Sequence, residues 1–203
     1  KNYFKDKIKF LSFPSLEAQI ASISDDIAYN SHDLEDGLKS NLFKLQDLES
    51  IPILKNIVHK HKKNIKNFST DLIIRQIVRE IINEMVEDII ETTKKNIKKY
   101  KLKNLNDVYI SYYPVVTFSK QMRNFDKNIK SFLKKKMYYH KDVKKNTNQG
   151  KKIIRKLFLT IKKNPEKYIN VSKYDKSDIA RSICDFIAGM TDRYAINLYN
   201  KIK

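Results

Sequence analysis

The sequence is poor in the residues that make turns and cross-links. It has 3 Gly and 4 Pro among 203 residues, too few for the many turns of a β-sandwich or barrel, and this favours long helices. A single cysteine, Cys184, rules out a disulfide within the chain and fits a reducing cytoplasm. No apolar run approaches the roughly 18 residues of a membrane-spanning helix, so we do not expect a membrane protein. The first residue is Lys1 rather than Met, which is typical of a sequence that begins partway through a longer protein.

The charge of the chain is strongly one-sided, with 42 Lys and Arg against 23 Asp and Glu and a formal net charge of +19. Attraction to a polyanion, whether a triphosphate, DNA or RNA, is one interpretation. AT-rich codon usage is the other, because Lys, Asn, Ile and Tyr are all abundant and Arg, the better bidentate phosphate ligand, is scarce. Composition alone leaves both interpretations open.

The spacing of apolar residues predicts an all-α fold. The clearest period lies between residues 70 and 90, where apolar positions recur at intervals of three and four after a cap at Ser69 or Thr70. Only residues 101–119 have an extended or β-like composition, centred on Val108–Tyr113. The other helices are expected at residues 15–37, 41–48, 54–63, 119–138, 144–163 and 177–202, the last of them hinged at Gly189-Met190-Thr191.

The helix expected between Ser15 and Gly37 has an unusual charge pattern, because it contains six carboxylates and no Lys or Arg. At about 100° per residue its two sides differ in character. The apolar side carries Leu16, Ile20, Ile23, Ile27 and Leu34, and the opposite side carries Asp25, Tyr29, His32, Asp33 and Asp36. Like charges on one helix face repel, so either solvent and lysines offset them or the face lines a cleft with a divalent cation and a polar substrate. Tyr29 favours the cleft, because an aromatic ring is an odd choice for a purely solvated face.

The dipeptide His32-Asp33 has the composition that names a large family of metal phosphohydrolases. That kind of site needs another His upstream, and no histidine precedes His32. His59 and His61 lie two residues apart among lysines, so we expect them to point to different helix faces and to be exposed. We therefore do not assign His32-Asp33 as a metal-binding dipeptide.

Two long segments resemble the bacterial deoxyguanosine triphosphate triphosphohydrolase family, which belongs to the HD-domain superfamily. They are Leu16–Gly37, which contains the motif Asp-Asp-Ile-Ala-Tyr, and Ile183–Ala195, which contains Gly-Met-Thr-Asp-Arg-Tyr. Arg79–Asp88 and Met137–His140, which lie between them, also resemble the family. The resemblance thus covers essentially the whole chain.

This resemblance implies a multi-helical HD-domain-type bundle. Residues 1–100 would be the C-terminal part of the helical core, and residues 101–203 the C-terminal helical region of the family. The implied reaction is hydrolysis of a deoxynucleoside triphosphate to a deoxynucleoside and inorganic triphosphate, with a divalent cation such as Mg²⁺ or Mn²⁺. By the same resemblance, Asp25 is the last metal ligand, Tyr29 contacts the nucleotide and Asp33 faces the deoxyribose.

The remaining expectations concern charge, activity and partners. Arg79 and Arg193 are candidates to neutralise the triphosphate, with structural ion pairs as the commoner alternative. The family's first His and its His-Asp pair have no counterpart here, so we expect no complete catalytic set and no activity from this chain alone. The resemblance further implies a homo-oligomer, regulated in some members by nucleotides or single-stranded DNA, and the lone Cys184 predicts a cytoplasmic location. The alternative function is a non-catalytic, basic helical module that binds nucleic acid or regulates another protein on an HD-like scaffold.

Overall fold

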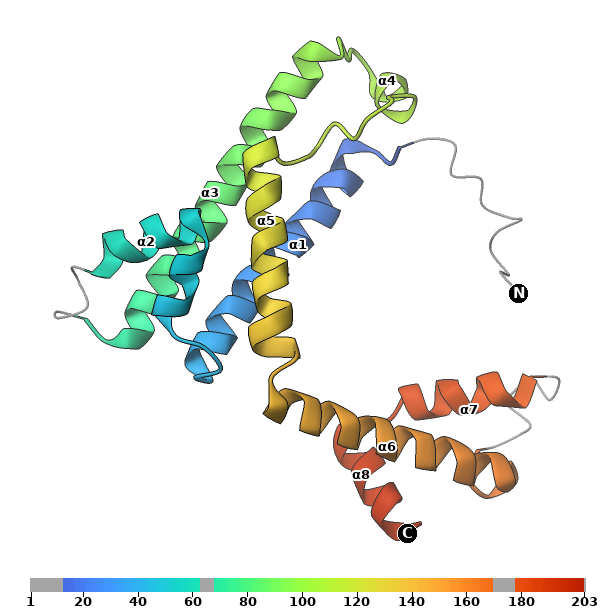
Figure 1. The fold of residues 1–203 in the computed structure, drawn as a ribbon. Helices are drawn as coiled ribbons and strands as arrows, with labels where there is room; N and C mark the ends of the chain where they lie inside the picture. Colours follow the sequence, from blue (N-terminus) through green and yellow to red (C-terminus); the bar gives the residue numbers. More distant parts are fainter. Residues whose placement is uncertain (1–12, 63–67, 170–177, 203) are drawn as a thin grey trace. The chain divides into compact units, whose positions relative to one another are not determined.

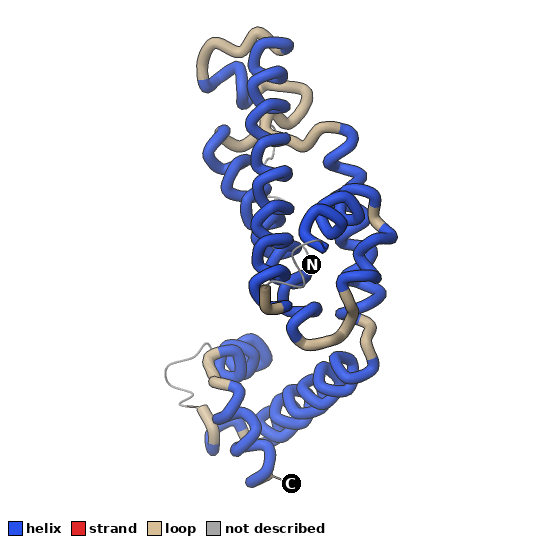
Figure 2. The backbone as a smooth tube through the Cα atoms, turned by 90° about the vertical axis from the view of Figure 1, so that its left-hand side faces the viewer, coloured by secondary structure: helices blue, strands red, loops and turns tan. Residues whose placement is uncertain are grey.

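The computed structural model describes residues 13–62, 68–169 and 178–202, and all regular structure in these ranges is helical (Figure 2). This confirms the all-α prediction. The chain divides into two compact units, Lys1–Tyr138 and Tyr139–Lys203, and each has its own apolar core. The expected boundary after residue 100 separates family regions rather than compact units, and it stays a prediction.

In the residues that the structure describes, the first unit has five α-helices, labelled α1–α5 in Figure 1, and two short helical turns of other types. They are α1 (Leu16–Lys39), η1 (Leu45–Ser50), α2 (Pro52–Lys62), α3 (Thr70–Lys99), α4 (Leu105–Tyr109), α5 (Lys120–Leu133) and η2 (Lys134–Tyr138). The first of the turns, η1, is 3₁₀-helical and lies a few residues later than the helix expected at 41–48. The second, η2, is π-helical and continues α5 to the predicted end at Tyr138.

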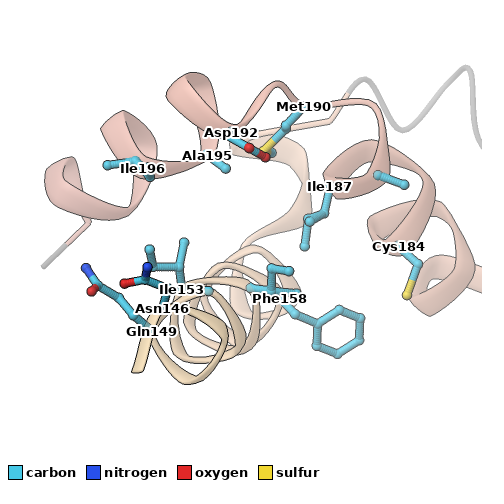
Figure 3. Close-up of a pocket in the computed structure, with 13 residues that line it drawn as sticks. Asn146, Gln149, Ile153, Phe158, Cys184, Ile187, Met190, Asp192, Ala195 and Ile196 are labelled. Atoms are coloured by element: carbon cyan, nitrogen blue, oxygen red, sulfur yellow. The ribbon is translucent and has the colours of Figure 1, made fainter. Parts of the chain in front are cut away.

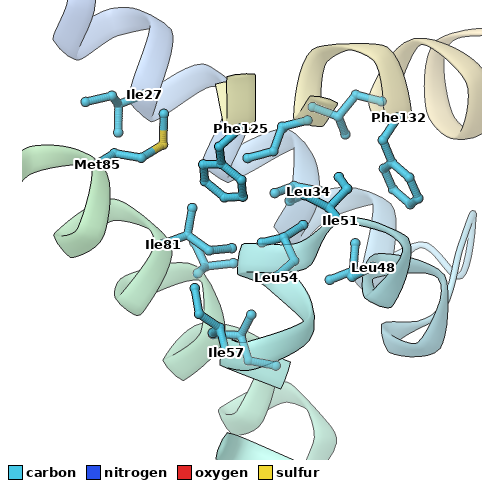
Figure 4. Close-up of a cluster of buried hydrophobic side chains, with 14 of the residues drawn as sticks. Ile27, Leu34, Leu48, Ile51, Leu54, Ile57, Ile81, Met85, Phe125 and Phe132 are labelled. Atoms are coloured by element: carbon cyan, nitrogen blue, oxygen red, sulfur yellow. The ribbon is translucent and has the colours of Figure 1, made fainter. Parts of the chain in front are cut away.

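The core of the first unit forms where α1 packs against α3 and α5, with α2 covering α3. Figure 4 shows Ile27 and Leu34 of α1 facing Ile81 and Met85 of α3, with the α5 ring of Phe125 between them. Burial of such side chains is worth about 1.5–3 kcal/mol each before the cost of ordering the chain. The buried residues of α3 follow the predicted period as far as Ile89, although Val86 and Ile90 are exposed.

Serine caps begin three of these helices, as the sequence predicts. The hydroxyls of Ser15, Ser69 and Ser119 each accept a hydrogen bond from the backbone N–H three residues further on. An N-cap of this kind satisfies one of the four free N–H groups of the first turn and is worth about 1 kcal/mol. The first residues of α1, α3 and α5 are therefore set by local chemistry.

The β-like or extended structure expected at residues 101–119, centred on Val108–Tyr113, was wrong at Leu105–Tyr109, which form α4, whereas residues 111–119 have no regular structure. A capping box begins α4 instead, because Asn104 accepts from the Asp107 N–H and the Asp107 carboxylate accepts from the Asn104 N–H. This reciprocal pair fixes a helical start in a segment whose β-branched and aromatic residues favour strand. The backbone beyond α4 is then held by side chains, among which Gln19 of α1 accepts from the N–H groups of Val115 and Val116.

The prediction that Gly37 ends the acidic helix was also wrong. The helix continues to Lys39, and the left-handed residue that follows it is Asn41, with φ 53°. Gly37 is buried inside the last turns of α1, where the ring of Phe43 packs against its Cα. The glycine is needed for this close approach and not for its conformational freedom.

The described part of the second unit contains α6 (Lys141–Lys163), η3 (Pro165–Lys167), α7 (Ile179–Ala188) and α8 (Asp192–Lys201). Asn164-Pro165 stops α6, and α7 and α8 are separated at Gly189–Thr191, both as predicted. Of the loop expected at 166–176, residues 170–176 lie outside the described ranges. The core of this unit gathers Leu157, Ile161 and Ile183, all fully buried.

None of the helices in the described part of the chain is long and apolar enough to cross a bilayer.

The two helical glycines make a matched test of this fold. A methyl group at Gly150, inside α6, meets no atom within 4 Å, so Gly150→Ala should stabilise the protein by about 0.5–1 kcal/mol. A methyl group at Gly37 overlaps the buried ring of Phe43, so Gly37→Ala should destabilise it by about 1–3 kcal/mol. Urea unfolding of both variants measures these changes, and shifts of the same sign would contradict the packing described.

Candidate functional site

The predicted site residues of α1 lie on the helix face that points away from the core. Asp25 and Tyr29 are exposed, the latter by 61%, and Asp33 is partly covered. These three residues follow one another at intervals of four, so each is about one turn, or roughly 6 Å, beyond the last. His32 and Asp36 are exposed on the same side, which confirms the predicted separation from Ile27 and Leu34.

Asp33 has a specific partner in Tyr138, the last residue of η2, whose hydroxyl donates a hydrogen bond to the Asp33 carboxylate. Partial burial and this bond raise the pKa of Tyr138 above its ordinary value, and the charge of Asp33 and the proximity of Tyr29 act in the same direction. The phenol is therefore protonated and neutral near pH 7, and its hydroxyl donates to the Asp33 carboxylate. It holds one oxygen of Asp33 and leaves the carboxylate with further lone pairs to accept a second hydrogen bond.

A polar cluster next to this face ties α1 to α5. The amide of Asn30 donates to the buried carboxylate of Asp126 at 2.9 Å. Lys130 bridges the two helices, at 3.0 Å from Asp126 and 3.3 Å from Asp26. Burial alone would lower the pKa of Lys130, but Asp126 and Asp26 together raise it, so the lysine stays charged and offsets part of the repulsion along α1.

The carboxylate of Asp25, like that of Asp36, is a free group on this face. It has no hydrogen bond or ion pair within the described ranges, unlike its neighbour Asp26, which binds Lys130. A free, exposed carboxylate is a suitable ligand for a hard divalent cation. In the part of the chain that the structure describes, no three His, Cys, Asp or Glu side chains converge to hold a metal ion. Asp25 can therefore contribute one ligand, and a complete metal site needs others.

The two predicted arginines lie on other helices than Asp25. Arg79 is exposed on α3, and Arg193 is exposed on α8, in the second unit. Neither side chain makes an ion pair with any residue whose position is described. The described residues therefore do not support the alternative that these two arginines form structural ion pairs. Their proposed role toward a triphosphate stays a prediction.

The histidines after α1 have structural contacts. His59 and His61 point to different faces of α2, as expected, since His59 contacts Glu49 at 3.3 Å and His61 contacts Glu80 of α3 at 2.6 Å. The expectation that both are exposed was wrong for His61, which is partly buried against α3. Burial alone would raise the pKa of Glu80, but its bonds with Lys60 and His61 lower it. His140 caps α6, with its ring accepting from the Asp142 N–H.

The C-terminal motif lies in the second unit and borders an apolar hollow of about 650 Å³ (Figure 3). Ile153 and Phe158 of α6 form one side of this hollow, and Ile187, Met190 and Ala195 of the α7–α8 segment form the other. Within the motif, Thr191 caps α8 and Asp185 pairs with Arg181. The lining is mainly apolar, so this hollow does not resemble a site for a triphosphate.

Tyr138, Asn30 and Asp126 are the residues of this region whose roles the sequence did not reveal. Tyr138 falls in the family-like segment Met137–His140, and this was the only available signal for it. Asn30 and Asp126 are 96 positions apart, and no pattern in the sequence links them.

Comparison with known proteins finds that the chain is similar to one group of relatives. Residues 116–201 match the phosphohydrolase-associated domain family. The chain is 51% identical over 195 residues to a deoxyguanosinetriphosphate triphosphohydrolase-like protein of Pelagibacter ubique, an alignment that covers 96% of this chain and 52% of the relative. Proteins with the same name are 36% identical in Bartonella tribocorum (94% of this chain, 49% of the relative) and 35% identical in Leptospira interrogans (93% and 51%). The chain spans about half the length of the curated relatives it matches.

Substitution of Tyr138 tests the contact between η2 and α1. Because the pKa of Tyr138 is raised in the folded protein, its contribution to stability is complete below the ordinary pKa of 10.0 and is lost as the pH rises above it. The free energy of unfolding should therefore differ between wild type and Tyr138→Phe by a constant amount up to about pH 9, and the difference should shrink toward about pH 11. The fully solvated Tyr112 is the control, since Tyr112→Phe should have no effect at either pH. A difference for Tyr138→Phe that does not depend on pH would contradict the contact.

Proposed function

We propose that this chain, which is homologous along almost its whole length to about half of a deoxyguanosinetriphosphate triphosphohydrolase-like protein, forms one wall of the active site of a metal-dependent dNTP triphosphohydrolase. The observation that carries the proposal is the exposed face of α1. There a free Asp25, an exposed Tyr29 and an Asp33 already bonded to Tyr138 follow one another at successive turns.

Each of these residues has a role that its surroundings support. Asp25 would ligate the divalent cation, Mg²⁺ or Mn²⁺, because its carboxylate is exposed and unpaired. When bound, the cation would act as a Lewis acid toward the phosphate and activate water near neutral pH. Tyr29 offers a ring and a hydroxyl to the nucleotide, one turn away.

Asp33 would recognise the sugar. Tyr138 fixes the orientation of the Asp33 carboxylate, which can then accept a hydrogen bond from a deoxyribose hydroxyl. A carboxylate held in advance by a neutral phenol loses little freedom on binding, which makes the contact more favourable than one from a mobile side chain.

The chemistry is an attack of water on the α-phosphorus, with the deoxynucleoside leaving as an alcohol and inorganic triphosphate as the second product. Arg79 and Arg193 are the candidates to neutralise the charge that develops on the triphosphate. Since Asp25 is a single ligand, the remaining ligands would come from outside this chain, and we propose that the chain alone is inactive. The complete enzyme would be a homo-oligomer.

A matched pair of substitutions tests the role of Asp25. In the complete protein, Asp25→Asn should lower Mn²⁺-dependent release of inorganic triphosphate from a deoxynucleoside triphosphate by at least about 100-fold, because it removes a metal ligand. Asp36→Asn is the control, since Asp36 is another exposed carboxylate of α1 with no side-chain partner that the structure describes, and it should retain activity. Product release is measured by ion chromatography, with circular dichroism to confirm folding.

Two outcomes would contradict this proposal. If Asp25→Asn turned over as fast as Asp36→Asn, Asp25 would not be a ligand. If the complete protein had no His followed by a His-Asp pair upstream, and released no triphosphate, the alternative of a non-catalytic module on an HD-like scaffold would replace the enzyme.

A further inference from the structure

The end of α3 and the segment that follows it carry a local excess of positive charge. Residues 94–120 contain seven lysines, no arginine and a single acid, Asp107. One of the lysines pairs with Glu91 at 3.3 Å, but the others have no carboxylate partner in the ranges that the structure describes. The Asp107 carboxylate is already used, because it accepts hydrogen bonds from two backbone N–H groups. The charge of these lysines is therefore available to a partner.

Large aromatic and aliphatic side chains are exposed beside these lysines. Ile110, the residue that ends α4, is 74% exposed, and Tyr112 and Tyr113 are 92% and 64% exposed. A hydrogen bond of 2.7 Å from the Ser111 hydroxyl to the Tyr113 carbonyl turns the backbone between them. Single exposed apolar side chains are common on protein surfaces, but a cluster of them marks an interaction site.

The lysines and the exposed apolar side chains meet around one hollow of about 480 Å³. Lys101 and Lys103 of the α3–α4 connection line it, together with Ile110, Tyr112 and Tyr113 of the segment that ends α4 and follows it. Figure 1 shows α4 beyond the end of α3, within the first unit. The cationic and apolar groups therefore lie on the same part of the surface and can contact one partner together.

Tyr100 joins the two groups of side chains. It follows α3, and its ring stacks on that of Tyr113, with the centroids 6.3 Å apart and the planes 26° from parallel. The ammonium group of Lys99 lies over the same ring, 5.6 Å from its centroid, where the π electrons attract it. These contacts hold the loop after α4 next to the lysines at the end of α3.

We infer that this surface binds an anionic membrane at the level of its headgroups, through Lys99, Lys101, Lys103, Ile110, Tyr112 and Tyr113. Lysines are attracted to the negative surface of a bilayer. Tyrosine rings prefer the boundary between headgroups and hydrocarbon, and an exposed isoleucine gains free energy when it enters that boundary. Each signal alone gives weak attachment, and the two together give stable attachment. This attachment does not require a membrane-spanning helix, and none of the described helices is one.

The composition of the surface distinguishes a membrane from other partners. Protein interfaces are rich in Arg and poor in Lys, whereas residues 94–120 contain seven lysines and no arginine. A nucleic acid would use the lysines and stack on the tyrosines, but Ile110 has no flat face for a base. An anionic lipid surface is the partner that uses the lysines, the tyrosines and the isoleucine together.

Co-sedimentation of the complete protein with lipid vesicles tests the inference. Vesicles of phosphatidylcholine with about 30% phosphatidylglycerol should bind it at least about 10-fold more tightly than phosphatidylcholine alone, and less tightly as salt is added. The triple change K99Q, K101Q and K103Q should weaken binding by about 100-fold, since each lysine near an anionic surface contributes about 5-fold. The double change I110S and Y112S should weaken binding by about 10-fold or more, with the salt dependence unchanged.

The second unit offers matched controls for both variants. Three exposed lysines of α6 are removed by K151Q, K152Q and K156Q. An exposed isoleucine and an exposed tyrosine are removed by I154S and Y194S. Each control should change vesicle affinity by less than about 2-fold, because these residues lie outside the surface.

Insertion of the loop can be measured directly by fluorescence. This chain has no tryptophan, so Tyr112→Trp adds one reporter to the complete protein, and the wild-type spectrum is subtracted from its emission. The emission should shift to shorter wavelength when phosphatidylglycerol vesicles are added, because the ring leaves water for the headgroup boundary. Tyr194→Trp, at another exposed tyrosine, should show no shift.

The inference is independent of the proposed hydrolase activity, since Asp25→Asn should bind the vesicles as wild type does. Equal losses in the α3 and α6 lysine variants would overturn it, because only net charge would then attract the protein. Vesicle binding without a shift in the Tyr112→Trp spectrum would exclude insertion of the loop. A failure to bind the vesicles, with a labelled dT oligonucleotide bound through the same lysines, would make the surface a nucleic-acid site instead.

Discussion

The hydrogen bond between Asn30 and Asp126 is the contact on which the arrangement of the first unit depends. It is buried, it joins residues 96 positions apart, and it fixes α5 against the middle of α1. A buried bond to a charged group is worth about 1.5–3 kcal/mol, and loss of either partner leaves an unsatisfied polar group in the core. Because η2 continues α5, the same contact determines where Tyr138 lies relative to Asp33.

This constraint explains why an acidic helix can lie in a chain with a net charge of +19 and still keep free carboxylates. Lys130 pairs with Asp126 and Asp26, so its positive charge neutralises these two carboxylates and leaves Asp25 unpaired. Tyr138 donates a neutral hydrogen bond to Asp33 and adds no charge. Asp25 is therefore left available, as a ligand for a cation from solvent must be.

The sequence was sufficient to predict the features that depend on local chemistry. The serine caps, the long α3 and the two faces of α1 follow from the spacing of residues a few positions apart. Features that depend on contacts between distant residues were either not predicted or predicted wrongly. The close packing of Phe43 on Gly37, the burial of His61 against Glu80 and the bond from Tyr138 to Asp33 each join separate elements. The α4 error was different in kind, because the Asn104 and Asp107 capping box is local, and it outweighs the strand propensity of the residues that follow it.

The central claim is that the exposed face of α1 is one wall of a metal and nucleotide site. The most direct measurement is anomalous scattering from crystals of the complete protein grown with Mn²⁺ and a non-hydrolysable deoxynucleoside triphosphate. The account predicts an anomalous peak at about 2.0–2.3 Å from a carboxylate oxygen of Asp25, with the deoxyribose next to Asp33 and Tyr138. A peak ligated elsewhere, with Asp25 exposed to solvent and the nucleotide away from α1, would contradict it.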